Sequence, residues 1–524
     1  MRARPFLAVV LTLAVTLLAL AGAGWWWVLA HSPLQLQHQP LQLPLAARFV
    51  PRQAPLSLYW LGDGRGLEAY ARAAAPGRMR RAAVASVNRL RDGAFAAAGL
   101  DYPSELDAWL GPETGLALLA DQPGAPPSGW LLSLRGRDGD GARRFLQRFW
   151  QARSLAGVDL QVGTYRGLGV ISGRGGVVGQ AERPLATALI NDNLVLIASG
   201  RAVLEQALDV SQIAELNQAA SPDLSAAIQQ LGEGLVLLHA SPEALQQWFA
   251  VPQGSGALTA ALRPQGAGLA LDARLALAEP LPAISSSTAS AALLSAYRAD
   301  ASSLALLQAP SQWPPLLKEL LARALSADEA GPLPALVAAA EPGPLLWARA
   351  DQGWQLATPA RSPDPQELAS ELQAQQLVQA PVQLAGQNVQ VWTRLAAQAN
   401  AAAAGQLEAT VVGAHTLASS AATAAPTWWG QSLPVLQALI EPAAGGRSAP
   451  NPLAAQLSDL GATRALLRWA MGPAPAQQLL QSWQPWQLLS SLAAQPLAGG
   501  VQGLSMSLEP ADQGLELRAN LRFG

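Results

Sequence analysis

The residue types that most often carry out chemistry are sparse in this chain. It has four histidines and no cysteine among 524 residues, which excludes disulfides, Cys-bound zinc, iron–sulfur clusters and thiol catalysis. His31 and His38 lie in a proline-rich stretch, where we expect no regular element. His239 ends the apolar run GLVLLH, and His415 lies among Ser, Thr and Ala without a nearby acidic residue. We therefore expect no metal site and no other cofactor.

Motifs for catalysis or nucleotide binding do not accompany these histidines. The G-x-S-x-G elbow is absent, and the glycines of residues 167–179 match neither the dinucleotide nor the Walker spacing. Asp138 and Asp140 resemble the start of a calcium loop without its Glu at the twelfth position, so we interpret them as a turn and a helix N-cap. We expect a protein that is not an enzyme. A Ser–His–Asp site stays open, because its members need not be close along the chain.

One concentration of basic residues stands out near the N-terminal end. Its members are Arg65, Arg72, Arg78, Arg80, Arg81, Arg89 and Arg91. Arg78, Arg80, Arg81 and Arg89 are candidates for contact with an anionic surface, either lipid headgroups or an acidic partner. A solvated helix face is the alternative that we favour. The net charge of −2 predicts no nucleic-acid partner.

The first 30 residues have the pattern of a transmembrane helix. Residues 6–29 carry no charge, and as a helix they would span roughly 36 Å, against about 30 Å of hydrocarbon. Arg2 and Arg4 precede this run, so the positive-inside rule places the N-terminus in the cytoplasm and the body on the far side. Trp25, Trp26 and Trp27 favour a retained anchor at the membrane interface over a cleaved signal peptide, for which residues 21–23 could be the site.

We expect the bilayer to be one partner, through residues 6–29. The next segment, residues 31–47, is rich in Pro, Gln and Leu and predicts an extended spacer, because prolines interrupt regular helices.

The body shows strand and helix patterns in alternation. Apolar spacing predicts helices over residues 78–98, 140–151 and 201–209. Predicted strands cover residues 54–61, 115–120, 130–134, 158–163, 167–172, 194–199, 234–239, 256–263 and 268–277. Adjacent strand pairs with short turns, interrupted by single helices, favour antiparallel sheets with helices on one face, an α+β class.

Similar segments recur in the same order in both halves, which indicates an internal duplication. PRQAPLSL from Pro51 resembles ADASSLAL from Ala299, LQQW from Leu245 resembles LQSW from Leu480, and GLALDARL from Gly268 resembles GLELRANL from Gly514. Gly129-Trp130 and Gly353-Trp354 form a weaker pair. We predict an N-terminal transmembrane helix in residues 1–30, a spacer over 31–47, and two similar sheet-plus-helix units over 48–285 and 286–524.

The segments ARFVPRQAPLSLYWL, GWLLSL, DGDGARRFLQRFW and DNLVLIASGRAVLEQAL, together with the predicted anchor, resemble cyanobacterial proteins of domain-of-unknown-function family 3352. The resemblance covers nearly the whole chain and is strongest over residues 47–209. It implies a membrane-attached protein from a cyanobacterium, with its body in the periplasm or thylakoid lumen. It supplies no catalytic residues.

Three functions are compatible with these observations. The first is a membrane-tethered binding or scaffolding protein that works through large sheet surfaces. The second is a carrier or chaperone for lipid or another apolar ligand, enclosed by two β-rich units. The third is an unrecognised hydrolase.

Overall fold

The computed structural model describes most of the chain after the N-terminal segment. The described residues are 32–122, 124–155, 159–175, 183–249, 251–277, 281, 288–325, 331–360, 362–363, 365–397, 407–417, 425–441, 451–460, 464–512 and 514–524.

The first half contributes ten strands to an antiparallel sheet. They are β1 (Leu56–Trp60), β2 (Leu110–Leu119), β3 (Gly129–Gly136), β4 (Leu160–Tyr165), β5 (Leu168–Gly175), β6 (Arg183–Ile190), β7 (Leu194–Ala198), β8 (Val236–Ala240), β9 (Ser255–Gln265) and β10 (Gly268–Leu277). Their order across the sheet is β4-β5-β6-β7-β3-β2-β1-β8-β9-β10.

The second half contributes ten more strands. They are β11 (Ser303–Gln308), β12 (Pro344–Ala350), β13 (Gly353–Thr358), β14 (Leu377–Leu384), β15 (Gln387–Ala397), β16 (Leu407–Thr416), β17 (Thr427–Gly430), β18 (Leu467–Met471), β19 (Val501–Ala511) and β20 (Gly514–Phe523). Their order, β14-β15-β16-β17-β13-β12-β11-β18-β19-β20, repeats that of the first half strand for strand.

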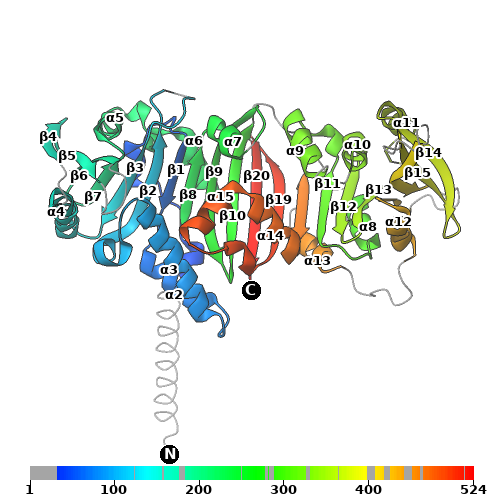
Figure 1. Ribbon diagram of the computed structural model, residues 1–524, viewed down its shortest axis with the longest axis horizontal. Helices are drawn as coiled ribbons and strands as arrows, with labels where there is room; N and C mark the ends of the chain where they lie inside the picture. Colours follow the sequence, from blue (N-terminus) through cyan, green and yellow to red (C-terminus); the bar gives the residue numbers. More distant parts are fainter. Residues whose placement is uncertain are drawn as a thin grey trace, which may run out of the picture.

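Antiparallel pairing of β10 with β20 joins the two halves into one sheet (Figure 1). Gly268 pairs with Arg522 and Ala276 pairs with Gly514, so the register is symmetric about the pair Asp272 and Arg518. Because the two central strands are antiparallel, the halves are related by a pseudo-twofold axis perpendicular to the sheet at this pair. Equivalent residues of the two halves therefore lie on the same face of the sheet.

Helices connect the strands of each half. Those of the first half are α2 (Gly64–Ala74), α3 (Arg80–Ala97), α4 (Gly139–Leu155), α5 (Arg201–Gln212), α6 (Pro222–Leu231) and α7 (Pro242–Phe249). Those of the second half are α8 (Thr288–Ala296), α9 (Pro315–Leu325), α10 (Leu333–Ala340), α11 (Pro365–Ala374), α12 (Leu433–Ile440), α13 (Pro452–Asp459), α14 (Pro473–Ser482) and α15 (Gln484–Leu492). The shorter helical turns are Pro33–His38, Leu45–Phe49, Tyr102–Leu106, Ala214–Leu216, Gln218–Ala220, Pro310–Gln312 and Leu497–Gly500.

Helices pack on both faces of the sheet. On β3, Leu132 lies in a core with Phe145 and Phe149 of α4, whereas the adjacent Leu131 lies in a core with Leu204 of α5. Neighbouring residues of a strand point to opposite faces, so α4 and α5 cover opposite sides. The face that carries α4, α9, α14 and α15 is turned toward the viewer in Figure 1, and we call it the front face.

The predicted fold class is wrong and needs two corrections. We expected two similar antiparallel-sheet units with helices on one face of each. The described residues instead form one continuous antiparallel sheet of twenty strands with helices on both faces, a mixed α/β architecture. The prediction failed because β10 and β20 each expose a strand edge, and pairing these edges satisfies backbone groups that two separate units would leave open. The unit boundaries at 285 and 286 stay a prediction.

The predicted single-pass membrane protein also needs correction. Among the residues that the structure describes, no helix is long and apolar enough to cross a membrane. The predicted span, residues 6–29, lies outside the described residues, as do Arg2, Arg4, Trp25, Trp26 and Trp27. All nine strands predicted for the first half are confirmed, as are α3, α4 and α5. The sequence patterns missed α2, β6, α6 and α7.

Candidate functional site

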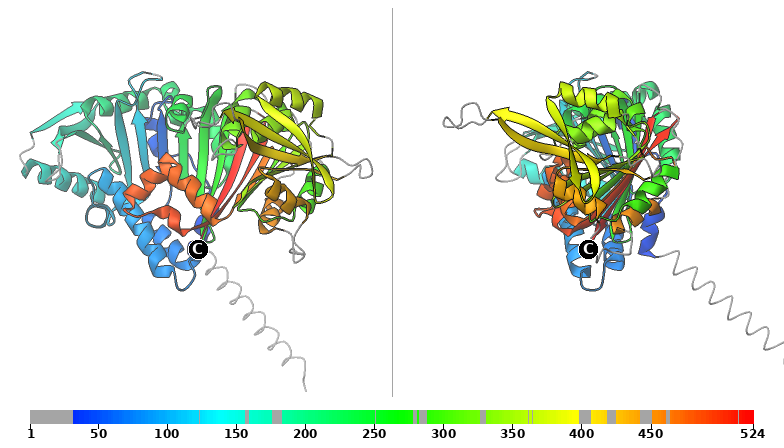
Figure 2. Two further views of the ribbon diagram at one scale, coloured as in Figure 1. Left: turned by 45° about the vertical axis from the view of Figure 1, so that its right-hand side comes forward. Right: turned by 90° about the vertical axis from the view of Figure 1, so that its right-hand side faces the viewer.

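The basic residues predicted as a site lie on a projecting pair of helices. The α2–α3 hairpin extends from the lower edge of the body in Figures 1 and 2. Of the 18 residues of α3, all described, none is buried. Arg72 forms an ion pair with Glu68 on α2, and Arg65 forms one with Asp107.

The four arginines proposed for anionic contact are exposed on this hairpin. In the described part of the chain, Arg78, Arg80, Arg81 and Arg89 form no ion pair with an acidic side chain, and Arg80 donates a hydrogen bond to the carbonyl of Ala75. The structure thus brings these arginines to one projecting element. Their contact with an anionic surface stays a prediction.

Two histidines of the sheet have pKa values well below the ordinary 6.5. His239 on β8 lies 3.0 Å from the Thr259 hydroxyl, and burial lowers its pKa to about 4. His415 on β16 stacks on the rings of Trp392 and Trp429, with ring centres 6.2 and 4.1 Å away. Burial lowers the pKa of His415 to about 4 as well. Both side chains are neutral at pH 7, and His415 is buried whereas His239 is half-buried.

A buried polar cluster lies beside His239 on the back face of the sheet. Ser57 and Tyr59 of β1 both donate hydrogen bonds to Oε1 of Gln218, at 2.9 and 2.8 Å. Ser57 on β1 is the cross-strand partner of His239 on β8. Because Ser57 is fully buried, its hydroxyl is not accessible from solvent. Among the described residues, no three His, Asp or Glu side chains lie close enough together to hold a metal ion.

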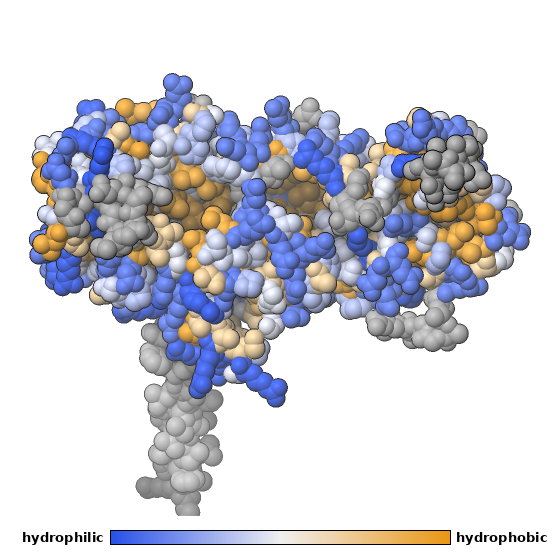
Figure 3. All heavy atoms as spheres, viewed as in Figure 1, coloured by the Kyte–Doolittle hydropathy of each residue, from blue (hydrophilic) through white to orange (hydrophobic). Residues whose placement is uncertain are grey.

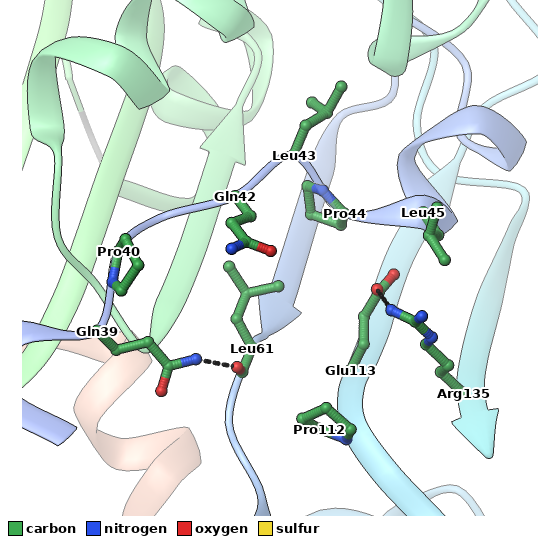
Figure 4. A pocket seen from close by; sticks show the side chains of 10 residues that line it. All are labelled: Gln39, Pro40, Gln42, Leu43, Pro44, Leu45, Leu61, Pro112, Glu113 and Arg135. Atoms are coloured by element: carbon green, nitrogen blue, oxygen red, sulfur yellow. Dashed lines mark hydrogen bonds and ion pairs between the residues drawn. The ribbon is translucent and has the colours of Figure 1, made fainter. Parts of the chain in front are cut away.

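A hollow of about 520 Å³ lies where the predicted spacer crosses β2 and β3 (Figure 4). Glu113 on its wall accepts a hydrogen bond from the backbone of Ala46 at 2.9 Å and forms an ion pair with Arg135 at 3.4 Å. Gln39 donates to the carbonyl of Leu61. Because these groups satisfy one another, we interpret the contacts as fastening the spacer to the sheet.

The candidate site that sequence analysis missed is an apolar part of the front face in the first half. Adjacent strands β3, β2, β1, β8 and β9 present half-buried or exposed apolar side chains there. We call this set the open face, and its residues are Leu56, Leu58, Trp60, Leu116, Leu118, Trp130, Val236, Leu238, Leu258 and Leu262. None of them carries a charge. Figure 3 shows hydrophobic atoms in a recess of the front face over β1, β2 and β8.

The second half shows how helices cover part of the equivalent face. Trp130 is the second residue of β3, and Trp354 is the second residue of β13. Trp130 pairs with Leu118 on β2, and Trp354 pairs with Arg349 on β12. Leu116 and Trp347 each lie two residues before these pairing partners. Leu116 and Trp347 are therefore equivalent. Leu116 is 40 % exposed, whereas Trp347 is 5 % exposed, and Trp354 is 1 % exposed where Trp130 is only half-buried.

The difference comes from the helices between equivalent strands. In the second half α9 and α10 lie between β11 and β12, and they pack in one core with Trp347 and Trp354. In the first half α2 and α3 lie between β1 and β2, but they form the projecting hairpin. The open face can therefore bind an apolar surface, since burying its leucines and tryptophans would release water.

Residues 10–313, more than half of the chain, match the model of the family described as Protein of unknown function (DUF3352). The chain belongs to this family. The match confirms the family that the sequence resembled, and it covers all strands of the first half, with the open face. The description of DUF3352 assigns no activity, and a cyanobacterial source stays a prediction.

Crystal forms I, III and IV of TP0453 are solved structures similar to part of this DUF3352 chain. Form I is 12 % identical and covers 45 % of this chain and 80 % of its own, with a TM-score of 0.28. Form III is 12 % identical and covers 45 % and 79 %, with a TM-score of 0.26. Form IV is 12 % identical and covers 44 % and 80 %, with a TM-score of 0.28. No curated protein matches the sequence significantly.

Proposed function

We propose that this chain is a binding or scaffolding protein, without enzymatic activity, that binds an apolar partner on the open face. The observation that carries the proposal is the contrast between Leu116, 40 % exposed, and its equivalent Trp347, 5 % exposed under α9 and α10. Both halves fold into the same strand order, but among the described helices α9 and α10 cover Trp347 of the second half, whereas α2 and α3 of the first half leave its equivalent Leu116 exposed. A contiguous uncharged patch of this kind is typical of an interaction site.

Binding of an uncharged dye tests the proposal. Nile red suits the purpose because it has no anionic group that the arginines of the α2–α3 hairpin would attract. We expect its fluorescence to rise with the wild-type chain, and Leu116→Glu to weaken binding roughly tenfold, since a carboxylate would have to lose its water. Leu116→Gln should weaken binding less, and it guards against a Glu variant that fails to fold.

The matched control is Leu155→Glu at the end of α4. Leu155 is 83 % exposed and lies outside the open face, so this variant should bind the dye like the wild type. Equal dye binding by all variants would refute the proposal. Extraction of the purified chain with organic solvent separates this function from a carrier. Stoichiometric co-purified lipid that is lost in Leu116→Glu would favour the carrier instead.

A further inference from the structure

The second half of the chain shows which kind of element can cover a surface equivalent to the open face. In the second half the part of the equivalent surface around Trp347 and Trp354 is covered by α9 and α10. Leu317 and Leu325 of α9 are 4 % exposed, and Leu333 and Val337 of α10 are fully buried. All four lie in the core that contains Trp347 and Trp354. The covering surface is thus a pair of helices with Leu and Val at helical spacing.

The helices at the equivalent place in the first half are poorly suited to cover the sheet. The sequence of α3, RRAAVASVNRLRDGAFAA, has a single leucine and four arginines, whereas PLLKELLARAL of α9 has five leucines. Gly93 of α3 packs so closely on α15 that a Cβ there would overlap the carbonyl oxygen of Leu492. The hairpin is held against α15, so its own helices leave the front of β1 and β2 open.

The backbone of the sheet also restricts the occupant. β1 is paired on both sides, with β2 and with β8, and β8 is paired in turn with β9. The open face therefore offers no free strand edge and presents apolar side chains. A partner that docks there must satisfy its own N–H and C=O groups, which a helix does internally and an extended segment does not.

We infer that the open face receives an amphipathic helix or helical hairpin of a partner protein, whose contact side is rich in Leu and Val and without charge. This inference rests on the proposed function and names its partner class. The partner helices would take the place that α9 and α10 occupy on the second half. This is the mode in which an apolar helix face lies in a hydrophobic groove.

A peptide from the chain itself is the probe. An unlabelled peptide of residues 310–342 carries the sequences of α9 and α10, and isothermal titration calorimetry measures its binding to the full chain. We expect saturable binding that Nile red competes with. Leu116→Glu in the chain should weaken peptide binding roughly tenfold, and Leu155→Glu should leave it unchanged.

A matched control peptide replaces Leu317, Leu325 and Leu333 by Gln and should not bind. If the peptide fails to bind while Nile red binding still depends on Leu116, the helical partner is wrong and the proposed function stands. If neither depends on Leu116, both are wrong. If phosphatidylcholine vesicles co-sediment with the wild type but not with Leu116→Glu, and the peptide does not bind, the occupant is lipid and the inference is overturned.

Discussion

At the scale of single residues, His415 links burial to acid sensitivity. Nε1 of Trp392 donates a hydrogen bond to its Nδ1 at 3.2 Å, so the ring is held in a neutral form. Because burial lowers the folded-state pKa to about 4, the folded state takes up a proton less readily than the unfolded state, whose pKa is about 6.5. The stabilisation is complete above the unfolded pKa and is lost as the pH falls toward the folded pKa.

We expect His415 alone to lower the free energy of unfolding by about 2 kcal/mol between pH 7 and pH 5. Urea titrations at both pH values measure this change. His415→Gln keeps an acceptor for Trp392 and should remove the contribution of His415, leaving that of His239, whose pKa is also lowered. An unchanged pH dependence in the variant would show that His415 does not titrate in this way.

Leu116 and Trp347 provide a second test, because they are equivalent residues in different surroundings. Trp347→Ala empties a position that is 5 % exposed, and we expect a loss of about 3–5 kcal/mol in unfolding free energy. Leu116→Ala removes a side chain that is 40 % exposed, and we expect less than about 1 kcal/mol. Chemical denaturation of both variants checks the contrast. Equal losses would mean that the open face is covered in solution.

At the scale of elements, the crossing of α3 with α15 depends on one glycine. Gly93 has no room for a methyl group against the backbone of Leu492, so Gly93→Ala must push the two helices apart. We expect a loss of about 1–3 kcal/mol, typical of overpacking. Gly77→Ala is the control, because a Cβ at Gly77 meets no atom within 4 Å. A fall in melting temperature for both variants alike would argue against a specific contact.

The elements also show how far sequence patterns reach. The matched segments pair Leu56 with Leu304, but the ladders make Ser57 the equivalent of Leu304. Following the strand pairings from Trp130 to β1 and from Trp354 to β11 gives this equivalence, and following them from β10 and β20 gives the same one. A slip of one residue moves every side chain to the other face. Apolar residues of the two segments align well in both registers, so the sequence alone could not decide between the registers.

The open face was hidden from sequence analysis for a related reason. Leu58, Leu116 and Leu238 follow the same alternation as core residues, and only the position of the neighbouring helices distinguishes a covered face from an open one. A signal did exist. The two helices between β1 and β2, α2 and α3, contain one leucine each, whereas α9 and α10 between β11 and β12 contain five and two. Comparing the repeats helix by helix would have indicated an uncovered surface.

At the scale of the whole molecule, the seam between the halves determines how the chain unfolds. The seam contains the β10–β20 ladder and an ion pair of 2.7 Å between Arg274 and Glu516. Contact between α3 of the first half and α15 of the second adds a link on the front face. Repeat proteins unfold as one unit when the interfaces between repeats are strong, and stepwise when they are weak.

We therefore expect one cooperative thermal transition for the whole body. Leu134→Ala tests this, because Leu134 is fully buried in the first half and its loss costs about 2–5 kcal/mol. In scanning calorimetry the entire transition should move to lower temperature as a single peak, since unfolding the first half removes the partner of β20. Leu155→Glu, far from the core at 83 % exposure, should leave the peak in place. Two peaks, with the upper one unmoved, would mean that β10 and β20 separate before either half unfolds.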